Sequence, residues 1–480
     1  MPLRPQVEKL RALRARPSVR SLWLDEALAG EQDALSLEGE IRADVCIVGG
    51  GFTGMWTALR LKERAPSLDI ALVEADVCGA GASGRNGGFV LSWWAKFRTL
   101  EALCGAEEAL RLARASAYGV AEIGAFCVEN GIDAEFRHDG WLWTATSPAQ
   151  VGAWAATVER AEQLGEQPFV RLEPAEVAQR AASPVHLAGV FEPTAATIHP
   201  ARLARGLRRV CLERGVRLFE HSPMRALDRK QPPRVRCDRG SVRAERVVLA
   251  LNAWAAGVSE MRRALVVIPS DVIATPRIPE RLLELNWPGG TCIDDARMMV
   301  NYWRSTLDGR IVFGKGGGGI SYGGKIGPEY EGPSPRAAWV LESFHRLYPS
   351  LRDVPAERSW LGPIDRTKDG LPFFGPLGRN DAILVGVGYS GNGVGPSYVG
   401  GSILASLALG ADDEWSRAGL VRAPQALPPE PIRYLGGKLV RSAVGRTEAA
   451  EDEGGRPRRV DLLLASLAPA GLVPLKRARP

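Results

Sequence analysis

Three glycines stand at the spacing of a site for nucleotide phosphates. Gly49, Gly51 and Gly54 follow the continuously apolar run Val45–Gly49, and a helix-patterned stretch comes after them. Glycine at these positions permits a tight turn, lets the backbone approach a pyrophosphate and allows close helix packing, while the helix N-terminus attracts the phosphates. A glycine-rich helix cap without a chemical role is the alternative.

A glutamate and the elements around it favour the nucleotide interpretation. Glu74 ends a second apolar strand about 20 residues beyond the last glycine, where an acid accepts hydrogen bonds from a ribose. An acid rather than an arginine at this strand end disfavours a 2′-phosphate. Strand, glycine turn, helix and second strand together predict a βαβ unit that binds FAD or NAD.

Two more glycine-rich segments follow. Cys78–Phe89 (CGAGASGRNGGF) has no helical or strand period, and we interpret it as a loop that contacts a flavin. Residues 383–388 repeat the apolar strand pattern, and glycines at 388, 391, 393 and 395 lead into helical spacing from Val399. This pattern predicts a second glycine turn before a helix N-terminus, with a merely flexible loop as the alternative.

The composition is that of a globular chain with more than one domain. Its 480 residues are 45% hydrophobic and 24% charged, which is enough material for two or more cores. The seven cysteines include no CxxC pair, which argues against a disulfide framework and against a zinc site, so we expect no metal. The sequence contains no run of eighteen apolar residues and no signal-peptide pattern, so we expect a cytoplasmic protein without a transmembrane segment.

The charge pattern gives weak support to a nucleic-acid partner. A net charge of +6 and a pI near 9.0 would suit an anionic partner. Basic and acidic residues are interspersed, however, except near the ends of the chain, at RPQVEKLRALRARPSVR and RPRR. We therefore expect no nucleic-acid partner, and an RNA-associated flavoprotein is kept as the non-enzymatic alternative.

Four further segments complete a family pattern. They are IHPARLARGLRRVCLERGVRLFE, GSVRAERVVLALNAWA, DGLPFFGP and ILVGVGYSGNGVGPSYVGGSILASLALG. In this order, and with the glycine turns, the chain resembles the D-amino-acid oxidase superfamily of FAD enzymes, which includes glycine, sarcosine and gamma-glutamylputrescine oxidases. The resemblance implies an α/β fold, in which an FAD-binding Rossmann-like domain of the glutathione-reductase type is interleaved with an α+β substrate domain on a mainly antiparallel sheet.

The resemblance also divides the chain. The expected parts are an N-terminal arm (1–40), a discontinuous FAD-binding domain (41–130, 197–260 and 357–412), a substrate domain (131–196 and 261–356) and a C-terminal extension (413–480). Within the extension, EAAEDEGGRPRR is expected to be disordered.

The resemblance further implies which residues contact FAD. The helix after the second glycine turn would point at the pyrimidine end of the flavin and stabilise its anionic reduced form. No histidine neighbours GASGRNGG and no cysteine lies in LGPIDRTKDG, the two places where relatives attach FAD, so we expect noncovalent FAD. The implied contact residues are Gly49, Gly51, Phe52, Thr53, Gly54, Glu74, Ala75, Ser83, Gly84, Arg85, Asn86, Gly87, Gly88, Met224, Ala250, Trp254, Gly388, Tyr389, Ser390, Gly391, Asn392, Gly393 and Val394.

One departure from the family concerns the substrate. Relatives that oxidise amino acids carry Leu-Arg-Pro ahead of DG-x-P, and this arginine binds the substrate carboxylate in a bidentate fork. Here the segment reads Leu361-Gly362-Pro363, which places an α-amino-acid substrate in doubt. SWWAKF, GWLWTAT, ALNAWA, YWRSTLDGRIVFGKGGGG, GYSGNGVGPS and PPEPIRY are similar to a subgroup of aminophosphonate oxidoreductases. A small aminoalkylphosphonate such as 2-aminoethylphosphonate or its N-methyl derivative is therefore the expected substrate, with another amine or amino acid such as gamma-glutamylputrescine as the alternative.

A phosphonate would need several cationic partners, because it carries up to two negative charges and three acceptor oxygens. The candidates are Arg304, Lys315 and Arg366, with Lys96 and Arg85 behind them. We expect Arg304 and Lys315 to line the substrate face of one sheet, and Lys315 is also the candidate catalytic group. Tyr302 alternates with Arg304 and so shares its face, as a further substrate-binding candidate. The alternatives are a solvated turn for Lys315 and a surface salt bridge for Arg304.

The expected reaction removes a hydride from the carbon that bears a neutral amine. Flavin N5 would receive the hydride, water would hydrolyse the resulting imine, and O2 or another acceptor would reoxidise the flavin. No protein base is strictly required, and the rate should rise with pH because an ammonium must first lose its proton. His199 precedes a proline at a predicted helix start and is interpreted as structural, and Trp93, Trp94, Trp141 and Trp143 are interpreted as core.

Overall fold

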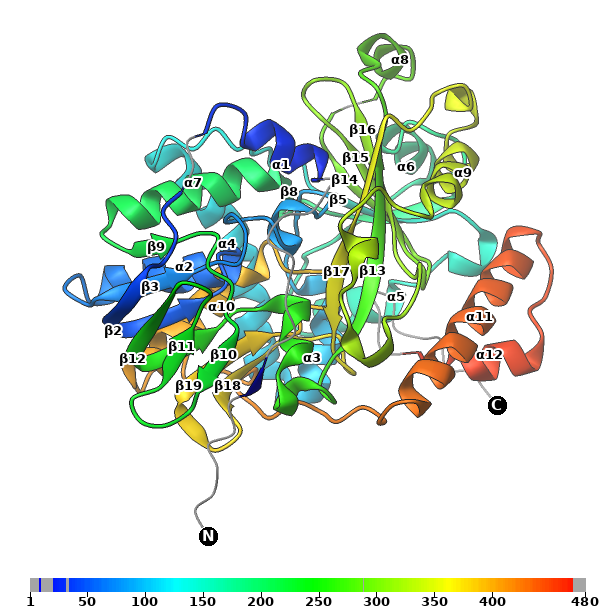
Figure 1. Cartoon of the computed structure of the whole chain (residues 1–480). Coiled ribbons are helices and arrows are strands. Elements are labelled where there is room, and N and C mark those ends of the chain that lie inside the picture. The colour runs from blue at the N-terminus through cyan, green and yellow to red at the C-terminus, as the bar shows by residue number, and fades with distance from the viewer. Residues whose placement is uncertain (1–7, 10–19, 32–33, 288, 469–480) are drawn as a thin grey trace.

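Two sheets organise the chain in the computed structural model, which describes residues 8–9, 20–31, 34–287 and 289–468. The first sheet and its helices lie in the left half of Figure 1, and the second sheet stands in the right half. Residues 1–7, 10–19 and 32–33 of the expected N-terminal arm and residues 469–480 of the C-terminal extension lie outside the described residues.

The first sheet has a parallel centre. β2 (Gly39–Val48) lies parallel between β12 (Gly240–Leu249) and β3 (Ile70–Val73). The last four residues of β2 are all buried, which explains why the run is continuously apolar rather than alternating. The other strands of this sheet are β1 (Glu8–Lys9), β9 (Arg217–Phe219), β10 (Ala226–Asp228), β11 (Arg234–Arg236), β18 (Phe373–Leu377) and β19 (Asn380–Val387).

Four helices gather on this sheet, as Figure 1 shows. They are α2 (Phe52–Arg64), α4 (Ala106–Glu129), α7 (Pro200–Glu213) and α10 (Pro396–Leu409). Their apolar residues form one core with the sheet, to which Met55, Val120 and Ile403 contribute. His199 is the N-cap of α7, where its Nδ1 accepts from the Arg202 amide at 3.2 Å, in agreement with the structural interpretation of this histidine.

The second sheet is antiparallel except for one pair. Its strands, in order, are β17 (Arg358–Arg366), β13 (Val266–Ala274), β16 (Ile311–Lys315), β15 (Asn301–Ser305), β14 (Cys292–Asp295), β5 (Trp141–Ala145), β7 (Ala188–Glu192) and β6 (Val170–Leu172). β14 and β5 are the parallel pair. α9 (Ala337–Leu347) and α6 (Pro174–Arg180) cover one face through a cluster that includes Trp303, Phe313 and Phe344. The mixed α/β fold with a mainly antiparallel second sheet is the expected one.

The remaining elements connect the sheets. The helices are α1 (Leu22–Ala27), α3 (Phe97–Cys104), α5 (Ala155–Gln163), α8 (Pro279–Glu284), α11 (Ile432–Asp452) and α12 (Arg459–Ala465). The 3-10 turns are η1 (Ala82–Gly84), η2 (Trp94–Lys96), η3 (Pro148–Gln150), η4 (Asn252–Gly257), η5 (Ser259–Met261), η6 (Tyr322–Gly324), η7 (Pro328–Tyr330) and η8 (Pro349–Leu351). β4 (Phe89–Val90) and β8 (Ala196–Thr197) form a two-stranded sheet.

Two expectations about organisation are wrong. β17 belongs to the second sheet, so residues 358–366 lie with the substrate domain rather than with the FAD-binding pieces. The segment Glu448–Arg459 is ordered: Asp452 at the end of α11 pairs with Arg297 and Arg346, and Glu448 accepts from the Met299 amide at 2.9 Å. The charged composition suggested disorder there because composition alone does not reveal ion pairs with residues that are distant in sequence.

The interpretation of four tryptophans as core agrees with the structure, and two further observations concern the cysteines and the helices. All seven cysteines are free thiols. Trp93, Trp94, Trp141 and Trp143 are buried in the core, and Trp141 and Trp143 stack at 5.4 Å. Within the described part of the chain, none of the helices combines the length and apolar character needed to cross a membrane.

Candidate active site

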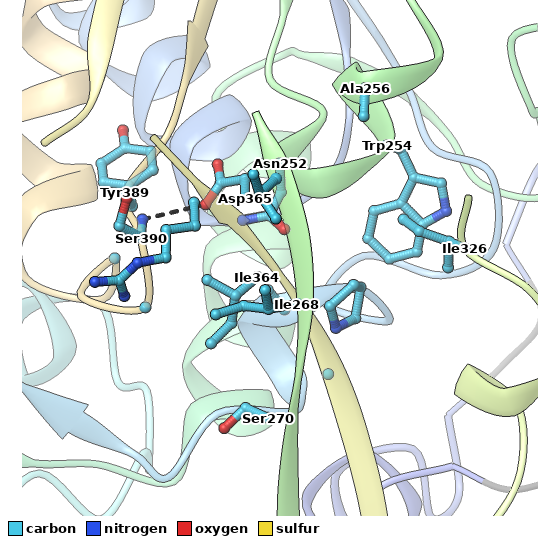
Figure 2. A pocket seen from close by; sticks show the side chains of 18 of the residues that line it. Asn252, Trp254, Ala256, Ile268, Ser270, Ile326, Ile364, Asp365, Tyr389 and Ser390 are labelled. Carbon is cyan, nitrogen blue, oxygen red and sulfur yellow. Dashed lines mark hydrogen bonds between the residues drawn. The ribbon is translucent and has the colours of Figure 1, made fainter. Parts of the chain in front are cut away.

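A cavity of about 1340 Å³ lies between the two sheets. Its walls are the glycine-rich turns after β2, β3 and β19, one face of the second sheet, and one side of α11. Small-molecule sites usually measure about 300–1,000 Å³, so this cavity has room for a large cofactor together with a substrate. Figure 2 shows part of the wall, where Ile268 of β13 lies beside Ile364 of β17, with Ser270 below them and Trp254 to one side.

Glycine is required at each position of the first turn for a different structural reason. Gly49 has a φ of +112°, which a side chain rarely tolerates. A Cβ on Gly54 would collide with the Gly49 carbonyl oxygen, so this residue permits close packing of α2 on the turn. Gly51 is the N-cap of α2 and lines the cavity, and a Cβ there would approach the Ser83 Oγ to 3.0 Å. The α2 N-terminus therefore lines the cavity without a side chain of its own turn in the way, and its Phe52 amide donates to the Ser83 Oγ at 2.9 Å.

Glu74 lines the cavity at the end of β3 and also braces the glycine turn. Its Oε2 accepts from the Gly50 amide at 2.7 Å and its Oε1 from the Asp76 amide at 3.0 Å. Burial raises the pKa of Glu74 to about 7, although both backbone hydrogen bonds act in the opposite direction. The contact with Gly50 is one that sequence reasoning missed.

The second glycine-rich loop is fixed by its own polar side chains. Asn86 Nδ2 donates to the carbonyls of Ala82 and Ser83 at 3.0 and 2.8 Å, and the Gly88 amide donates to Asn86 Oδ1 at 2.7 Å. The guanidinium of Arg85 donates to the carbonyls of Ala80, Tyr330 and Leu361 at 2.8, 2.7 and 3.2 Å. Arg85 therefore ties this loop to β17.

The third glycine turn is held by Asp365, a residue that sequence reasoning did not identify. Its carboxylate accepts from the Gly388 amide at 2.5 Å and from the Ser390 amide at 3.3 Å, and Figure 2 shows Asp365 beside Ser390 and Tyr389. Burial raises the pKa of Asp365 to about 6, while the backbone donors lower it. Ser390 has a φ of +57°, a left-handed conformation that this pairing supports. The turn leads into the N-terminus of α10.

Most of the residues that the resemblance implies for FAD line the cavity. Those that do are Gly49, Gly51, Phe52, Thr53, Glu74, Ala75, Ser83, Arg85, Asn86, Gly87, Met224, Ala250, Trp254, Tyr389, Ser390, Gly391, Asn392, Gly393 and Val394. Gly54, Gly84, Gly88 and Gly388 lie behind this wall. A Cβ on any of these four would collide with a neighbouring residue, so they permit the close packing of the turns.

The residues present fit a bound dinucleotide. The α2 N-terminus would hold the pyrophosphate, Glu74 the ribose, and the 388–394 turn the flavin ring system. The Nε1 atom of Trp254, a cavity-lining residue, is buried and has no hydrogen-bond partner among the described residues. No cysteine or histidine is among the described residues that line the cavity.

The second sheet offers a polar face to the cavity. Ser270 is paired with Gly362 across β13 and β17, and Gly362 stands where the resemblance places an arginine in relatives. A Cβ on Gly362 would lie 3.4 Å from the Arg85 Cβ, an ordinary contact. Tyr302 lies over Gly314 and its hydroxyl is 2.8 Å from Ser270 Oγ. Tyr302, Ser270 and Gly362 all line the cavity.

The expectation that Arg304 and Lys315 share the substrate face is wrong. On β15 and β16, Lys315 is paired with Asn301, while Tyr302 is paired with Gly314. Because side chains alternate along a strand, Lys315 lies on the face opposite to Tyr302. Its Nζ donates to Asn301 Oδ1 at 2.8 Å and lies 4.7 Å from the Trp339 ring centre, away from the cavity wall.

Arg304 shares the face of Tyr302, as expected, but it is covered. Its Nε donates to the Gly87 carbonyl at 2.9 Å and its Nη2 to the Ile198 carbonyl at 2.8 Å. The side chain is 2% exposed, and burial lowers its pKa to about 10. Arg304 is therefore a brace beneath the second glycine-rich loop, rather than a surface ion pair or a cavity-lining group.

Two other cations do line the cavity. Arg366 ends β17, and Lys96 ends η2. Burial and the nearby Arg366 lower the pKa of Lys96 to about 7, and burial lowers the pKa of Arg366 to about 10. Both depressed values mean that burial disfavours the charged forms of these two side chains.

The C-terminal extension completes the wall. Gly436, Gly437, Val440, Arg441 and Val444 lie along one side of α11 and line the cavity. α11 approaches closely because a Cβ on Gly437 would contact Ile320 at 2.5 Å. From the sequence, PPEPIRY was the only signal that this extension belongs to the site.

The chain belongs to the DAO family: the model of that family, FAD dependent oxidoreductase, matches residues 44–407. The protein is thus an FAD-dependent oxidoreductase, and α11 lies beyond the matched region.

Named relatives agree with this assignment. The chain is 30% identical over 378 residues to gamma-glutamylputrescine oxidoreductase of Escherichia coli (strain K12), covering 78% of this chain and 85% of that protein. It is 25% identical over 382 residues to glycine oxidase of Geobacillus kaustophilus (strain HTA426), covering 76% of this chain and 93% of that protein. The crystal structure of glycine oxidase from Geobacillus kaustophilus superposes with a TM-score of 0.65 at 21% identity, over 81% of this chain and 100% of that chain. L-proline dehydrogenase from P. horikoshii gives 0.64 at 19% identity, over 80% and 100%.

Proposed function

We propose that this protein oxidises the carbon–nitrogen bond of a small amine that carries an acidic group at its other end. The favoured substrate is an aminoalkylphosphonate such as 2-aminoethylphosphonate or its N-methyl derivative. The observation that carries this proposal is the pair of cations on the cavity wall, the buried Lys96 and the half-buried Arg366. Gly362, which also lines this cavity, stands where the resemblance places the arginine of amino-acid-oxidising relatives.

The electrostatics of the wall support an anion with more than one charge. A single carboxylate needs one planar fork, whereas a phosphonate has three acceptor oxygens and up to two charges. Lys96 contributes a compact point charge, and Arg366 a set of directional donors. Binding at this wall would orient the substrate, with its amine directed away from the two cations.

The chemistry itself comes from the cofactor, which accepts a hydride when bound. The protein supplies the enclosed cavity, the orientation of the substrate, and donors at the α10 N-terminus that favour negative charge on the ring system. We propose that FAD is held noncovalently and is released intact by acid or heat. O2 or another acceptor would complete the cycle.

Gamma-glutamylputrescine is the second candidate, and a specific observation favours it. The relative at 30% identity is named gamma-glutamylputrescine oxidoreductase. This compound also carries a carboxylate at the end remote from the reacting amine, so the same cations could bind it. It is longer than 2-aminoethylphosphonate, and the part of the cavity that α11 borders would have to accommodate its chain.

Flavin bleaching without oxygen tests the proposal. The panel contains 2-aminoethylphosphonate, its N-methyl derivative, gamma-glutamylputrescine, glycine and propylamine. We expect the aminophosphonates to bleach the flavin fastest at equal concentration. Fastest bleaching by gamma-glutamylputrescine would select the second candidate, and bleaching by glycine alone would overturn the proposal.

A further inference from the structure

We infer that Asp294 is the group that binds the ammonium of the substrate and takes its proton. This inference rests on the proposed function, because it requires an amine substrate, and it assigns a role to a residue that neither motif nor fold singled out. Asp294 lies on β14, where it is paired with Tyr302 of β15, so both side chains belong to the cavity face of the sheet. Asp294 also lines the cavity.

One oxygen of the buried Asp294 carboxyl lacks the hydrogen-bond partner that a buried acid normally has. The residue is 2% exposed, and its Oδ1 has no hydrogen-bond partner among the described residues. Burial, and then the neighbouring Asp295, raises the pKa of Asp294 well above its ordinary value, while the indole of Trp141 acts in the opposite direction. A buried carboxylate oxygen without a hydrogen-bond partner is costly, and a cation would relieve that cost.

Among the described residues, the titratable groups that interact with Asp294 are acids. They are Cys292 on its own strand, Tyr302 on β15 and the adjacent Asp295, whose side chain points to the other face. Arg304 is on the same face, but its donors are taken by the carbonyls of Gly87, Ile198 and Ser305.

The next residue along the chain shows the contrast. Asp295 points to the other face, where its carboxylate accepts from the amide and the Nδ2 of Asn301, at 2.9 and 2.5 Å, and pairs with Arg297 at 3.1 Å. Two adjacent acids of similar burial thus have opposite surroundings. The protein itself supplies hydrogen bonds and an ion pair to Asp295, whereas Oδ1 of Asp294 is available to a ligand.

The proton inventory follows from this arrangement. Before binding, Asp294 is protonated and the substrate is an ammonium ion. When the two form an ion pair, the carboxyl loses its proton to the solvent, so binding releases one proton. Within the pair, breaking an N–H bond and forming an O–H bond moves the remaining proton to the carboxyl and leaves a neutral amine. No electrons are transferred in this step. The neutral amine is the form from which hydride removal can occur.

A non-oxidisable ammonium tests the inference apart from the reaction. tert-Butylammonium has no hydrogen on its nitrogen-bearing carbon, so it cannot be oxidised, and tert-butanol is its uncharged counterpart. Both are titrated calorimetrically into the FAD-loaded wild type, Asp294→Asn, Asp294→Glu and Asp295→Asn, in buffers of different ionisation enthalpy. We expect wild type to bind tert-butylammonium with release of about one proton, and Asp294→Asn to bind it about tenfold to a hundredfold more weakly.

The controls separate binding from structure. Asp294→Asn should leave tert-butanol binding and the melting temperature unchanged, because Oδ1 has no protein partner to lose. Asp294→Glu should recover part of the binding. Asp295→Asn should lower the melting temperature by removing the partner of a buried arginine. Failure of wild type to bind tert-butylammonium, equal binding by Asp294→Asn, or a loss shared with tert-butanol would each overturn the inference.

The proposed function can fail separately. If none of the amines bleaches the flavin but tert-butylammonium binding still depends on Asp294, the cation site stands and the amine-oxidising function falls. If amines bleach the flavin equally well in wild type and in Asp294→Asn between pH 7 and 9, the function stands and the inference falls.

Discussion

The hydroxyl groups of Tyr302 and Ser270 are hydrogen-bonded at 2.8 Å across a strand that separates them. Tyr302 is on β15 and Ser270 on β13, and β16 lies between those strands. Gly314 of β16 is directly opposite Tyr302, and a Cβ there would collide with the tyrosine ring. The missing side chain therefore lets the ring lie flat across the strand and form part of the cavity floor.

Gly314→Ala should displace the Tyr302 ring from Ser270. We expect a loss of about 1–3 kcal/mol of stability from overpacking, and a lower kcat/KM at unchanged FAD content. The measurements are the melting temperature, the flavin absorbance per protein and steady-state kinetics. Gly316→Ala is the matched control, because a Cβ there would lie 3.5 Å from Val300, an ordinary contact. Equal effects of the two substitutions would contradict the role given to Gly314.

Gly51→Val should abolish retention of FAD. The valine would lie at the N-terminus of α2, where the backbone must approach the pyrophosphate, and would crowd Ser83, whose Oγ accepts from the Phe52 amide. The purified variant should be colourless yet keep the wild-type circular dichroism spectrum. Gly332→Val provides the control, since a Cβ at Gly332 meets nothing within 4 Å. A variant at Gly51 that held stoichiometric FAD would contradict the assignment of the cradle.

The sequence predicted the parts of this site that depend on local pattern. Gly49, Gly51 and Glu74 are separated by fixed short intervals, and strand and helix periods surround them, so their placement follows from the chain alone. The alternation rule also gave the shared face of Tyr302 and Arg304.

Residues whose role depends on long-range register could not be predicted. Lys315 looked like a partner of Arg304, but its face is decided by how β16 pairs with β15, and one residue of register reverses it. Asp365 acts by accepting from amides at Gly388 and Ser390, more than twenty residues away, and no local pattern signals this. The role of α11 was likewise not predictable from local pattern, because it depends on which side of the helix lines the cavity.

Val440→Trp should discriminate between long and short substrates. Val440 lies on the side of α11 that borders the cavity, so a larger side chain would shorten the space available to a substrate chain. We expect the KM for gamma-glutamylputrescine to rise more than the KM for 2-aminoethylphosphonate, with FAD content unchanged. Leu439→Trp is the control, because Leu439 is 51% exposed on the outer side of α11. Equal KM changes for both substrates would show that α11 does not limit substrate length.

Lys96 should make the stability of the protein depend on pH. Burial lowers its pKa from 10.5 to about 7, so between these values the unfolded chain holds a proton that the folded protein has released. The contribution of Lys96 to the free energy of unfolding therefore rises with pH from about 7 to 10. Melting temperatures of wild type and Lys96→Met across this range measure it, and the wild type should gain stability relative to the variant. Ethylphosphonate should flatten the difference by restoring the lysine charge, and a pH-independent difference would contradict the buried position.

The anion site gives the most direct test of substrate class. Lys96→Met and Arg366→Met each remove a charge from the cavity wall, and a charge-assisted hydrogen bond is worth about 1.5 to 3 kcal/mol. At about 1.4 kcal/mol per factor of ten, kcat/KM on 2-aminoethylphosphonate should fall roughly tenfold to a hundredfold or more, and much less on propylamine. FAD occupancy is measured in parallel.

Lys315→Met is the matched control for this experiment. Lys315 is also a buried lysine, but it lies on the opposite face of the sheet, bonded to Asn301, so its loss should lower the melting temperature and leave the ratio between the two substrates unchanged. Equal losses of Lys96→Met and Arg366→Met on both substrates would assign these residues to flavin binding or folding. If Lys315→Met instead changed the ratio of kcat/KM between 2-aminoethylphosphonate and propylamine, the anion site would have to lie on the Lys315 face of the sheet. Only a cation within reach of the phosphonate can distinguish it from propylamine.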